Sequence, residues 1–331
     1  MPAELTTVSE CTAVVFDGMD VKRYDGLAPG TDFAFDGVTG RTLAHPGGEL
    51  LCRFATVNDV HFGETECGVI EGLDIGPILS VEEGERPYPD TMNYAAVDEI
   101  KAIAPAAVIA KGDLTARGTK DEYELFVACY GDAFGDTLTH VRGNHDAYHD
   151  DIAPEGPVEL VLPGVTVALL DTVIPRATTG QVTAQQLEWL DELAARTDQP
   201  VLVMGHHHVW SPVSKSREPT YFGISPDDSD KLIDVFTRHE NLRGYFAGHT
   251  HRNRVRQIPA TGNVPWVEVS ATKDFPGAWA EYRVFEGGIL QVMHRISSRD
   301  ALDWTERTRQ MFGGMYPQYS FGDLTDRCFA I

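Results

Sequence analysis

The stretch VRGNHDAYHD, residues 141–150, decides the fold because it joins an apolar run to a cluster of strongly polar side chains. The run TLTHV, residues 137–141, is typical of a strand, and Asn144, His145 and Asp146 follow it almost at once. Polar groups at the end of a buried strand need a hydrogen-bond partner or a ligand. The stretch therefore predicts a shared polar site beyond the carboxyl end of a strand.

Four further polar clusters follow apolar runs in the same way. They contain Asp59 and His61, then Asp113, then His206 to His208, then His249 and His251. In an open α/β sheet the carboxyl ends of the strands border one crevice, so residues distant in sequence become neighbours. We expect all five clusters to form a single site.

The segments between these clusters alternate strand-like apolar runs with helical patterns. The helical patterns cover residues 93–103, 120–134, 183–196 and 230–240, and Thr183 is a predicted N-cap. This alternation predicts an α/β fold with a largely parallel sheet and helices outside it.

Three regions are expected along the chain. Residues 1–50 predict a small antiparallel β appendage, and residues 51–300 predict the main domain. Residues 301–331 predict a C-terminal tail that packs on the core or in an oligomer contact. Two long stretches without periodicity, 63–92 and 211–228, start directly after ligand clusters, so we expect them to form the rim of the site.

Composition excludes several classes of protein. Fifty acidic residues against 27 basic ones give a net charge of −23, which disfavours binding to nucleic acid. No basic N-terminal segment precedes an apolar stretch, and no run of about 18 apolar residues occurs, so we expect a cytoplasmic protein without membrane contact. Five cysteines without CxxC spacing predict reduced thiols rather than disulfides or a thiolate metal site.

Seven side chains in the clusters are candidate metal ligands. They are Asp59, His61, Asp113, Asn144, His206, His249 and His251. Imidazole, carboxylate and amide ligands suit Mn, Fe or Zn, and seven exceed the needs of one tetrahedral zinc. Two divalent ions carry +4, and two aspartates and a bridging hydroxide return −3, which would leave a centre of about +1 that attracts an anionic substrate.

The motifs resemble those of the calcineurin-like metallophosphoesterases. The chain has DVH at 59–61, GD at 112–113, GNHD at 143–146, GHHH at 205–208 and GHTH at 248–251, in the family's order. The resemblance spans residues 51 to about 251. It implies a two-sheet β-sandwich flanked by helices, with a dinuclear metal centre at the strand ends and residues 51–300 as the catalytic domain.

The resemblance also implies roles for individual residues. The first metal would be held by Asp59, His61 and His251, the second by Asn144, His206 and His249, with Asp113 bridging them. His145 would face the substrate as a general acid or a transition-state donor. His206 is chosen because VMGHHHVWS resembles a purple acid phosphatase segment in which the His after Gly binds metal. His207 is left open between supporting the ligands and contacting phosphate.

The segment GDLTARG departs from the motifs of two subgroups of the family, which disfavours both subgroups. GDLTARG has Ala116 where the protein serine/threonine phosphatases have an aspartate that orients the catalytic histidine. The same segment has no tyrosine, so no purple iron site is expected. The remaining pattern is most similar to bacterial phosphodiesterases of the class III cyclic-nucleotide type.

The sequence therefore predicts a phosphoesterase that uses two divalent or trivalent metal ions. A metal-bridging hydroxide would attack a small phosphodiester, a cyclic nucleotide or a related compound. A phosphomonoesterase on the same site and a catalytically silent binding module are the alternatives, and the complete ligand set disfavours the second.

The sequence leaves open whether the protein forms a homo-oligomer.

Some side chains outside the predicted metal ligands are candidates for contacts to the substrate. Arg142, Lys215, Arg217 and His207 are candidate phosphate contacts, and for each of them plain surface charge is the alternative. Tyr221 and Phe222 are candidates for stacking on a base or an aryl group, or for packing within their loop. The acidic residues Glu82, Glu83 and Glu85 are expected near the mouth of the pocket, where they would favour diesters.

Overall fold

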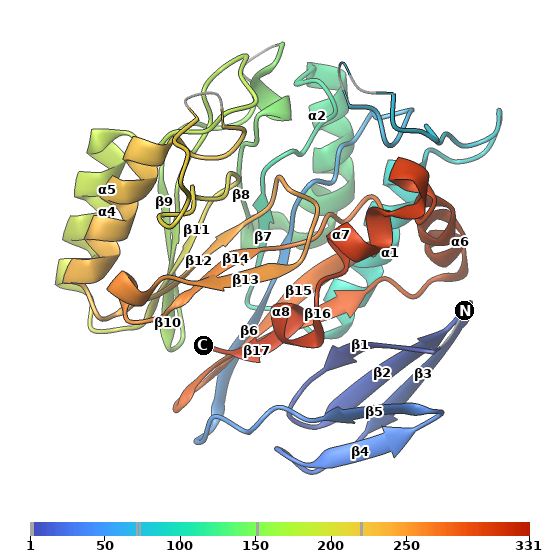
Figure 1. Ribbon diagram of the computed structural model, residues 1–331, viewed down its shortest axis with the longest axis horizontal. Helices are drawn as coiled ribbons and strands as arrows, with labels where there is room; N and C mark the ends of the chain where they lie inside the picture. Colours follow the sequence, from blue (N-terminus) through green and yellow to red (C-terminus); the bar gives the residue numbers. More distant parts are fainter. Residues whose placement is uncertain (1–2, 71, 73, 150–151, 219–220) are drawn as a thin grey trace.

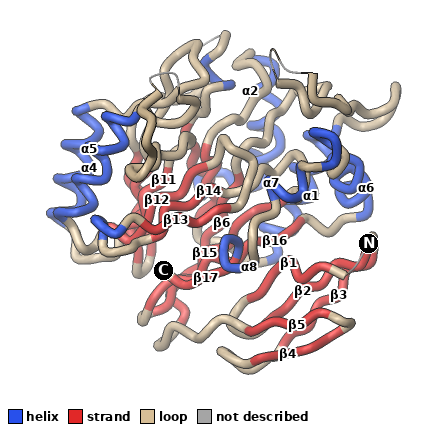
Figure 2. Tube along the Cα trace, viewed as in Figure 1, coloured by secondary structure: helices blue, strands red, loops and turns tan. Residues whose placement is uncertain are grey.

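Two six-stranded sheets lie face to face, with helices on their outer faces (Figures 1 and 2). The computed structural model describes residues 3–70, 72, 74–149, 152–218 and 221–331. The core between the sheets contains Phe54 and Ile109 of one sheet and Val167 and Leu202 of the other, all fully buried. The predicted α/β fold with two sheets and flanking helices is confirmed.

The first sheet has the strand order β17-β16-β15-β6-β7-β8. Its strands are β6 (Leu50–Val57), β7 (Ala107–Lys111), β8 (Leu138–Val141), β15 (Ala278–Phe285), β16 (Gly288–Arg295) and β17 (Cys328–Ala330). The strands β6, β7 and β8 are parallel, while β15, β16 and β17 pair antiparallel.

The second sheet has the order β13-β14-β12-β11-β10-β9. Its strands are β9 (Val158–Leu162), β10 (Val165–Leu169), β11 (Val201–Met204), β12 (Leu242–Ala247), β13 (Arg254–Gln257) and β14 (Pro265–Glu268). Its four central strands are parallel, and β9 and β13 pair antiparallel at the edges.

Both sheets are therefore mixed, which corrects the expectation of a largely parallel sheet. The reason is the length of the connections. Pro163 and Gly164 alone separate β9 from β10, and two residues separate β15 from β16. Antiparallel neighbours need only such a tight turn, whereas a parallel crossover needs a dozen or more residues.

Helices cover the outer face of each sheet, and all of them except α1 begin after a residue whose side chain caps the helix. The first sheet is covered by α1 (Tyr88–Ala102), α2 (Lys120–Phe126) and α6 (Arg299–Thr308), and the second by α4 (Ala184–Arg196) and α5 (Pro226–Arg238). The predicted N-cap Thr183 is confirmed, since its hydroxyl accepts a hydrogen bond from the Gln186 amide. A π-helical turn (Val127–Gly131) separates α2 from the short α3 (Asp132–Phe134), so the predicted helix 120–134 is not continuous.

The N-terminal segment forms two small antiparallel sheets. One contains β1 (Glu4–Val8), β2 (Thr12–Asp17) and β3 (Asp20–Asp25), and the other β4 (Asp32–Phe35) and β5 (Val38–Arg41). Strand β1 packs on β16, where the Thr7 hydroxyl donates to the Met293 carbonyl at 2.7 Å. The Arg283 guanidinium also donates to both oxygens of Glu10. The predicted domain boundaries at residues 50 and 300 stay predictions.

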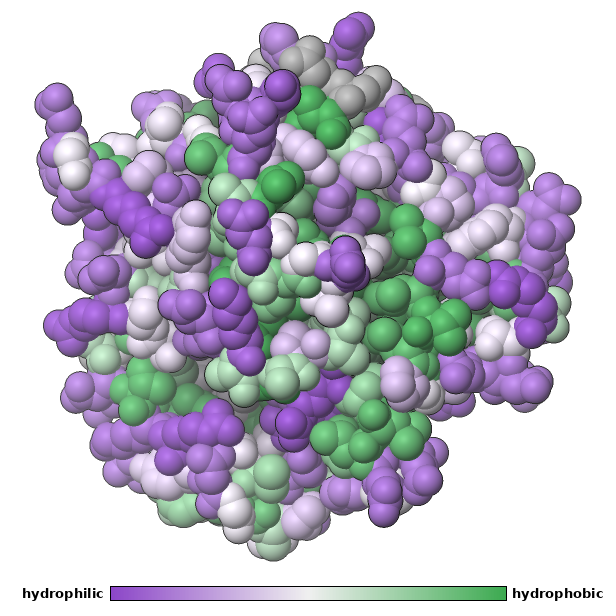
Figure 3. Space-filling model, turned by 180° about the vertical axis from the view of Figure 1, so that it is seen from behind, coloured by the Kyte–Doolittle hydropathy of each residue, from purple (hydrophilic) through white to green (hydrophobic). Residues whose placement is uncertain are grey.

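The last thirty residues contain α7 (Tyr316–Ser320), α8 (Leu324–Arg327) and β17. Strand β17 adds to the edge of the first sheet beside β16. Seen from behind, hydrophilic side chains cover most of the surface and hydrophobic ones form separate patches (Figure 3). Among the helices of the described residues, none is long and apolar enough to cross a membrane.

A buried histidine in β8 predicts a pH dependence of stability. His140 packs against Phe126, and its Nε2 lies 3.0 Å from the Tyr123 hydroxyl. Burial lowers its pKa from 6.5 to about 4. In the unfolded chain this imidazole binds a proton below about pH 6.5, so the folded state loses stability as the pH falls from there toward 4.

His140→Phe removes this titration and keeps an aromatic ring. Between pH 7 and pH 5 the wild type is expected to lose about 2 kcal/mol more unfolding free energy than the variant. Urea unfolding of both proteins at the two pH values, with EDTA present, measures the difference. Equal losses would show that His140 titrates normally in the folded chain.

Candidate metal centre

All five polar clusters lie directly after the carboxyl ends of strands β6, β7, β8, β11 and β12. The structure brings their side chains together, as the sequence predicts, in four overlapping groups whose potential ligand atoms lie within 4.8 Å of one another. The parallel strands cause this convergence, since three belong to one sheet and two to the other and all end at the same side of the sandwich (Figure 1).

Asp59, His61 and His251 form one of these groups. The His251 Nε2 atom lies 3.4 Å from Asp59 Oδ1, and the rings of His61 and His251 are 5.6 Å apart. Asp59 is fully buried, and His251 is the most open of the three. The three residues that the resemblance assigns to the first metal thus lie together.

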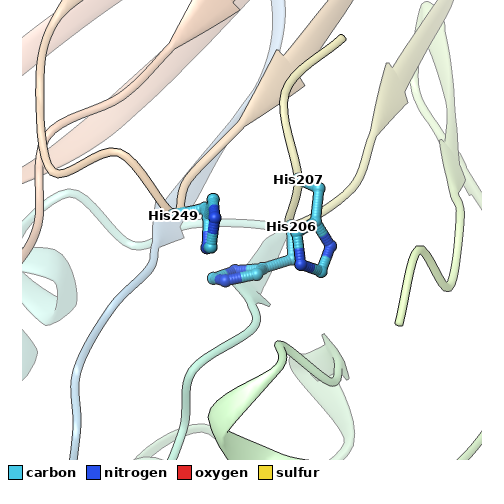
Figure 4. Close-up of side chains that lie close together, drawn as sticks. All are labelled: His206, His207 and His249. Atoms are coloured by element: carbon cyan, nitrogen blue, oxygen red, sulfur yellow. The ribbon is translucent and has the colours of Figure 1, made fainter. Parts of the chain in front are cut away.

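His206, Asn144 and His249 lie together on the other side. The His206 Nε2 atom lies 3.1 Å from Asn144 Oδ1, and the rings of His206 and His249 are 5.1 Å apart. Figure 4 shows the imidazoles of His206, His207 and His249 gathered from two strand-end loops. The His249 Nε2–H donates to the Phe222 carbonyl at 2.7 Å, which leaves Nδ1 as its potential ligand atom.

Asp113 stands between the two groups. Its Oδ2 lies 3.5 Å from His61 Nε2 and 3.2 Å from His206 Nε2. One carboxylate oxygen therefore faces a predicted ligand of each metal. This is the arrangement that a carboxylate shared by two cations requires.

The chemistry of His61 tests whether these residues fit a metal. It is buried, and neither ring nitrogen has a hydrogen-bond partner among the described residues. An unpaired buried polar group costs free energy, and a cation beside the ring removes that cost. The donor set of imidazoles, carboxylates and one amide is also one that Mn, Fe or Zn accepts. The residues present therefore fit a metal pair.

Two of the predicted ligands are oriented through their second ring nitrogen. The His251 Nδ1 lies 3.0 Å from Asp274 Oδ2, and the His206 Nδ1 lies 2.9 Å from the Lys111 carbonyl. Metal-binding histidines commonly donate their other N–H to a carboxylate or carbonyl, which fixes the ring and its tautomer. Sequence reasoning missed Asp274, which lies six residues after the end of β14, farther from its strand than the predicted clusters are from theirs.

The charges of the site divide its imidazoles into two kinds. Burial opposes protonation of His206 and His251, but nearby carboxylates outweigh it and raise the pKa of His206 to about 9 and that of His251 to about 10. Burial lowers the pKa of His61 to about 4 and that of His249 to about 3. Burial also opposes ionisation of Asp113, yet the charge of His206 holds its pKa well below the usual range. A cation that binds here replaces protons on His206 and His251.

Five of the seven predicted ligands have a left-handed backbone conformation. They are Asp59, His61, Asp113, His249 and His251, with φ between 48° and 69°. Such angles are uncommon for residues other than glycine and cost of order 1–3 kcal/mol where the surroundings enforce them. Two glycines in neighbouring loops make room for these ligands, since a Cβ on Gly143 would meet Asp113 Oδ1 at 2.2 Å and one on Gly248 would meet Asp59 Oδ2 at 2.8 Å. The strain is concentrated on the ligands themselves.

His145 lies beside the first group but is held by the backbone. Its amide donates to Asp113 Oδ1 at 2.9 Å, and its Nδ1–H donates to the Ala116 carbonyl at 2.6 Å. Its ring is 4.5 Å from that of His61. The Ala116 carbonyl therefore fixes the orientation of the His145 ring and leaves Nε2 as the ring nitrogen that it does not engage.

Asp146 anchors the loop that carries Asn144 and His145. Its carboxylate accepts hydrogen bonds from the amides of Gly143, Leu114 and Thr115 and from the Thr115 hydroxyl. The loops after β7 and β8 are thereby joined. Asp146, the last residue of the GNHD motif, thus has hydrogen-bond partners for both of its carboxylate oxygens.

The side chains predicted to contact phosphate differ in their burial and in their partners. His207 is buried beside His206 and His249, and its Nδ1 faces the Thr172 hydroxyl at 2.8 Å. Arg142 is buried and donates to Asp171 and Glu155, while Arg217 is paired with Asp227 and Asp230 at the surface. Contacts of His207, Arg142, Lys215 and Arg217 to phosphate stay predictions.

Both long loops border the site in their described parts. Glu64 and Ile70 of the first loop and Phe222 of the second lie beside His249 or His251, while residues 71, 73 and 219–220 lie outside the described residues. Tyr221 donates to or accepts from His208 and packs against Trp210. Glu85 borders a separate cavity with Trp304, which does not support its expected place at the mouth.

Comparison with known proteins agrees with this geometry. The family model of the calcineurin-like phosphoesterases matches residues 52–253. A probable glycerophosphodiester phosphodiesterase of Arcobacter nitrofigilis is 26% identical over 67% of this chain and 85% of its own length. A probable cyclic nucleotide phosphodiesterase of Synechococcus sp. is 25% identical over 54% of this chain and 71% of its own.

A solved structure shows the same fold. The dimetal phosphatase from Danio rerio aligns with a TM-score of 0.56 and 16% identity, covering 75% of this chain and 98% of that one. The fold and the match over the five motifs together define the class of protein, and the chain belongs to the calcineurin-like phosphoesterase family. It is a metal-dependent phosphoric ester hydrolase.

Proposed function

We propose that the protein is a dinuclear phosphoesterase that hydrolyses small phosphodiesters, a cyclic nucleotide or a related compound. The observation that carries this proposal is Asp113 Oδ2, which faces His61 Nε2 at 3.5 Å and His206 Nε2 at 3.2 Å. One shared carboxylate between two ligand groups is suited to two cations rather than one. The metals would be Mn, Fe or Zn in the divalent or trivalent state.

Asp59, His61 and His251 would hold the first ion, Asn144, His206 and His249 the second, and Asp113 both. A bound pair supplies Lewis acidity and lowers the pKa of a coordinated water toward neutrality. The protein's own share is to fix the ligands through Asp274, the Lys111 carbonyl and the strained loops. His145 would deliver a proton from Nε2 to the leaving oxygen, or donate a hydrogen bond to the phosphoryl group.

Two considerations support a diester over a monoester. Relatives of the chain carry phosphodiesterase names. The net charge of −23 disfavours substrates that bring two negative charges, whereas a diester brings one. A small phosphoester is thus the proposed partner. The oligomeric state, a cytoplasmic location and the lack of nucleic-acid or membrane contact stay predictions.

Substrate preference tests this assignment. With protein loaded with Mn²⁺, kcat/KM for bis(p-nitrophenyl) phosphate is expected to exceed that for p-nitrophenyl phosphate by about tenfold, a difference of 1.4 kcal/mol. Both reactions release the same chromophore, so one assay measures both. A preference for the monoester would establish the phosphomonoesterase alternative instead. Activity on neither ester, in protein that retains two metals, would favour the silent binding module.

A further inference from the structure

A cavity of about 430 Å³ opens directly beside the predicted first metal ligand, His251. Its lining contains Lys273 and Asp274, together with Val69 and Ile70 of the loop that follows His61. The C-terminal tail adds Met311, Phe312, Tyr316 and Tyr319 to the lining. None of these tail residues lies near the metal-binding motifs in sequence.

Hydrogen bonds hold the C-terminal tail against two other segments beside this cavity, the 63–92 loop and the GHTH motif. The Gly313 amide donates to the Gly76 carbonyl at 2.9 Å, which joins the tail to the 63–92 loop. The Tyr319 hydroxyl donates to the Thr250 carbonyl at 2.9 Å, between the two histidines of the GHTH motif. Helix α6, at the start of the tail, packs against α1 (Figure 1). The cavity wall is therefore an ordered part of the fold.

Tyr316 connects the tail to the metal ligands. Its hydroxyl donates to Asp274 Oδ1 at 2.6 Å, and Asp274 Oδ2 faces His251 Nδ1 at 3.0 Å. One carboxylate thus orients His251 and holds the tail. A group bound in the cavity would lie next to whatever His251 ligates.

Phe312 has an unusual backbone conformation at this wall. Its φ and ψ are 52° and 44°, in the left-handed region, and Gly313 and Gly314 also have positive φ. A bulky residue in this region is an outlier, and such strain persists where the surroundings enforce it, often at binding sites. The ring packs edge to face on Tyr316 at 5.3 Å.

The charges of the cavity leave it close to neutral. Among its described lining residues, Lys273 is the only lysine or arginine, and it is paired with Glu64. Asp274 is already engaged by His251 and Tyr316. The walls are apolar or aromatic, and Ile70 is 42% exposed and Val69 55% exposed. The cavity is suited to an uncharged apolar or aromatic group and offers no cation for a second phosphate.

We propose that this cavity binds an apolar or aromatic ester group of the substrate, and that Phe312 and Ile70 are specificity-determining residues. The inference rests on the proposed phosphodiesterase function, because the phosphorus must lie at the metals for its substituent to reach the cavity. The substrate class is then an organic phosphodiester with one bulky uncharged ester group.

Two diesters with the same leaving group test the proposal. Methyl p-nitrophenyl phosphate and phenyl p-nitrophenyl phosphate differ only in the group that would enter the cavity. The wild type is expected to prefer the phenyl ester. Phe312→Ala and Ile70→Ala are expected to lower kcat/KM for the phenyl ester by about tenfold, within the range for lost apolar contacts, and to change that for the methyl ester less than twofold.

Met315→Ala is the matched control, since Met315 is on the same tail, is 59% exposed and is not among the residues that line the cavity. If Phe312→Ala disturbs the strained tail, Ile70→Ala still tests the cavity, because Ile70 lies on the 63–92 loop and not on the tail. The proposal is overturned if both variants lose kcat/KM equally on the two esters, or if neither variant loses kcat/KM on either ester.

A binding measurement separates this proposal from the proposed function. Isothermal titration of Mn-loaded protein with phenylphosphonate and methylphosphonate needs no turnover. Tighter binding of the phenyl compound, weakened about tenfold by Ile70→Ala, is expected. Failure to hydrolyse either diester would contradict the proposed function alone, whereas equal affinity for both phosphonates would contradict the cavity's role alone.

Discussion

Asp113→Ala is expected to lower kcat/KM for bis(p-nitrophenyl) phosphate by at least about 10³-fold, because it removes the one carboxylate that faces both ligand groups. Metal bound per chain is expected to fall from two ions to one or none. The loss of metal follows from the distances, since His61 and His206 would no longer share an anionic oxygen.

The matched control is Asp20→Ala. Asp20 is an exposed aspartate at the start of β3 in the N-terminal appendage and lies outside the five clusters, so wild-type rates are expected. Circular dichroism of the metal-free proteins checks that Asp113→Ala is folded. A folded variant that keeps two metals and more than a tenth of the wild-type rate would show that Asp113 does not bridge.

His145→Ala is expected to lower kcat by about 10²-fold or more while leaving two metals bound. The reason is its position: the ring lies 4.5 Å from that of His61, yet its Nδ1 is committed to the Ala116 carbonyl. Nε2 is then the atom available to the substrate. The metal content distinguishes this variant from Asp113→Ala.

The choice of leaving group distinguishes the two proposed roles of His145, which are general acid and hydrogen-bond donor to the phosphoryl group. A general acid matters most when the leaving alcohol is a poor one, so the loss is expected to be greater for methyl phenyl phosphate than for methyl p-nitrophenyl phosphate. Equal losses would indicate a hydrogen bond to the phosphoryl oxygens instead. His45→Ala, in the N-terminal appendage, is the control. Activity within threefold of wild type for His145→Ala would remove His145 from the reaction.

The site could be predicted largely because its determinants are local. Each ligand follows an apolar strand, and the parallel strands direct the loops to one edge, so seven residues spread over almost two hundred positions meet. Asp274 and the Ala116 carbonyl escaped prediction for different reasons. Asp274 belongs to no motif, and a backbone carbonyl carries no signature in the side-chain sequence.

The fold was predicted less completely, for reasons of long-range pairing. Strand β1 lies in the first eight residues yet packs on β16 near the other end of the chain, and β17, in the last four residues, pairs with the same strand. The left-handed conformation of Asp59 and His251 is likewise enforced by tertiary packing, against local preference. The wall of the cavity beside His251 could not be foreseen, because the tail reaches it only in three dimensions.

Anomalous diffraction from crystals of the Mn-loaded protein, at the manganese edge, measures the central feature most directly. The expected result is two peaks about 3.5–4 Å apart, one between Asp59 and His251 and one between Asn144 and His249, both bound by a single oxygen of Asp113. A single peak, or two peaks with Asp113 bound to only one of them, would contradict a shared dinuclear centre.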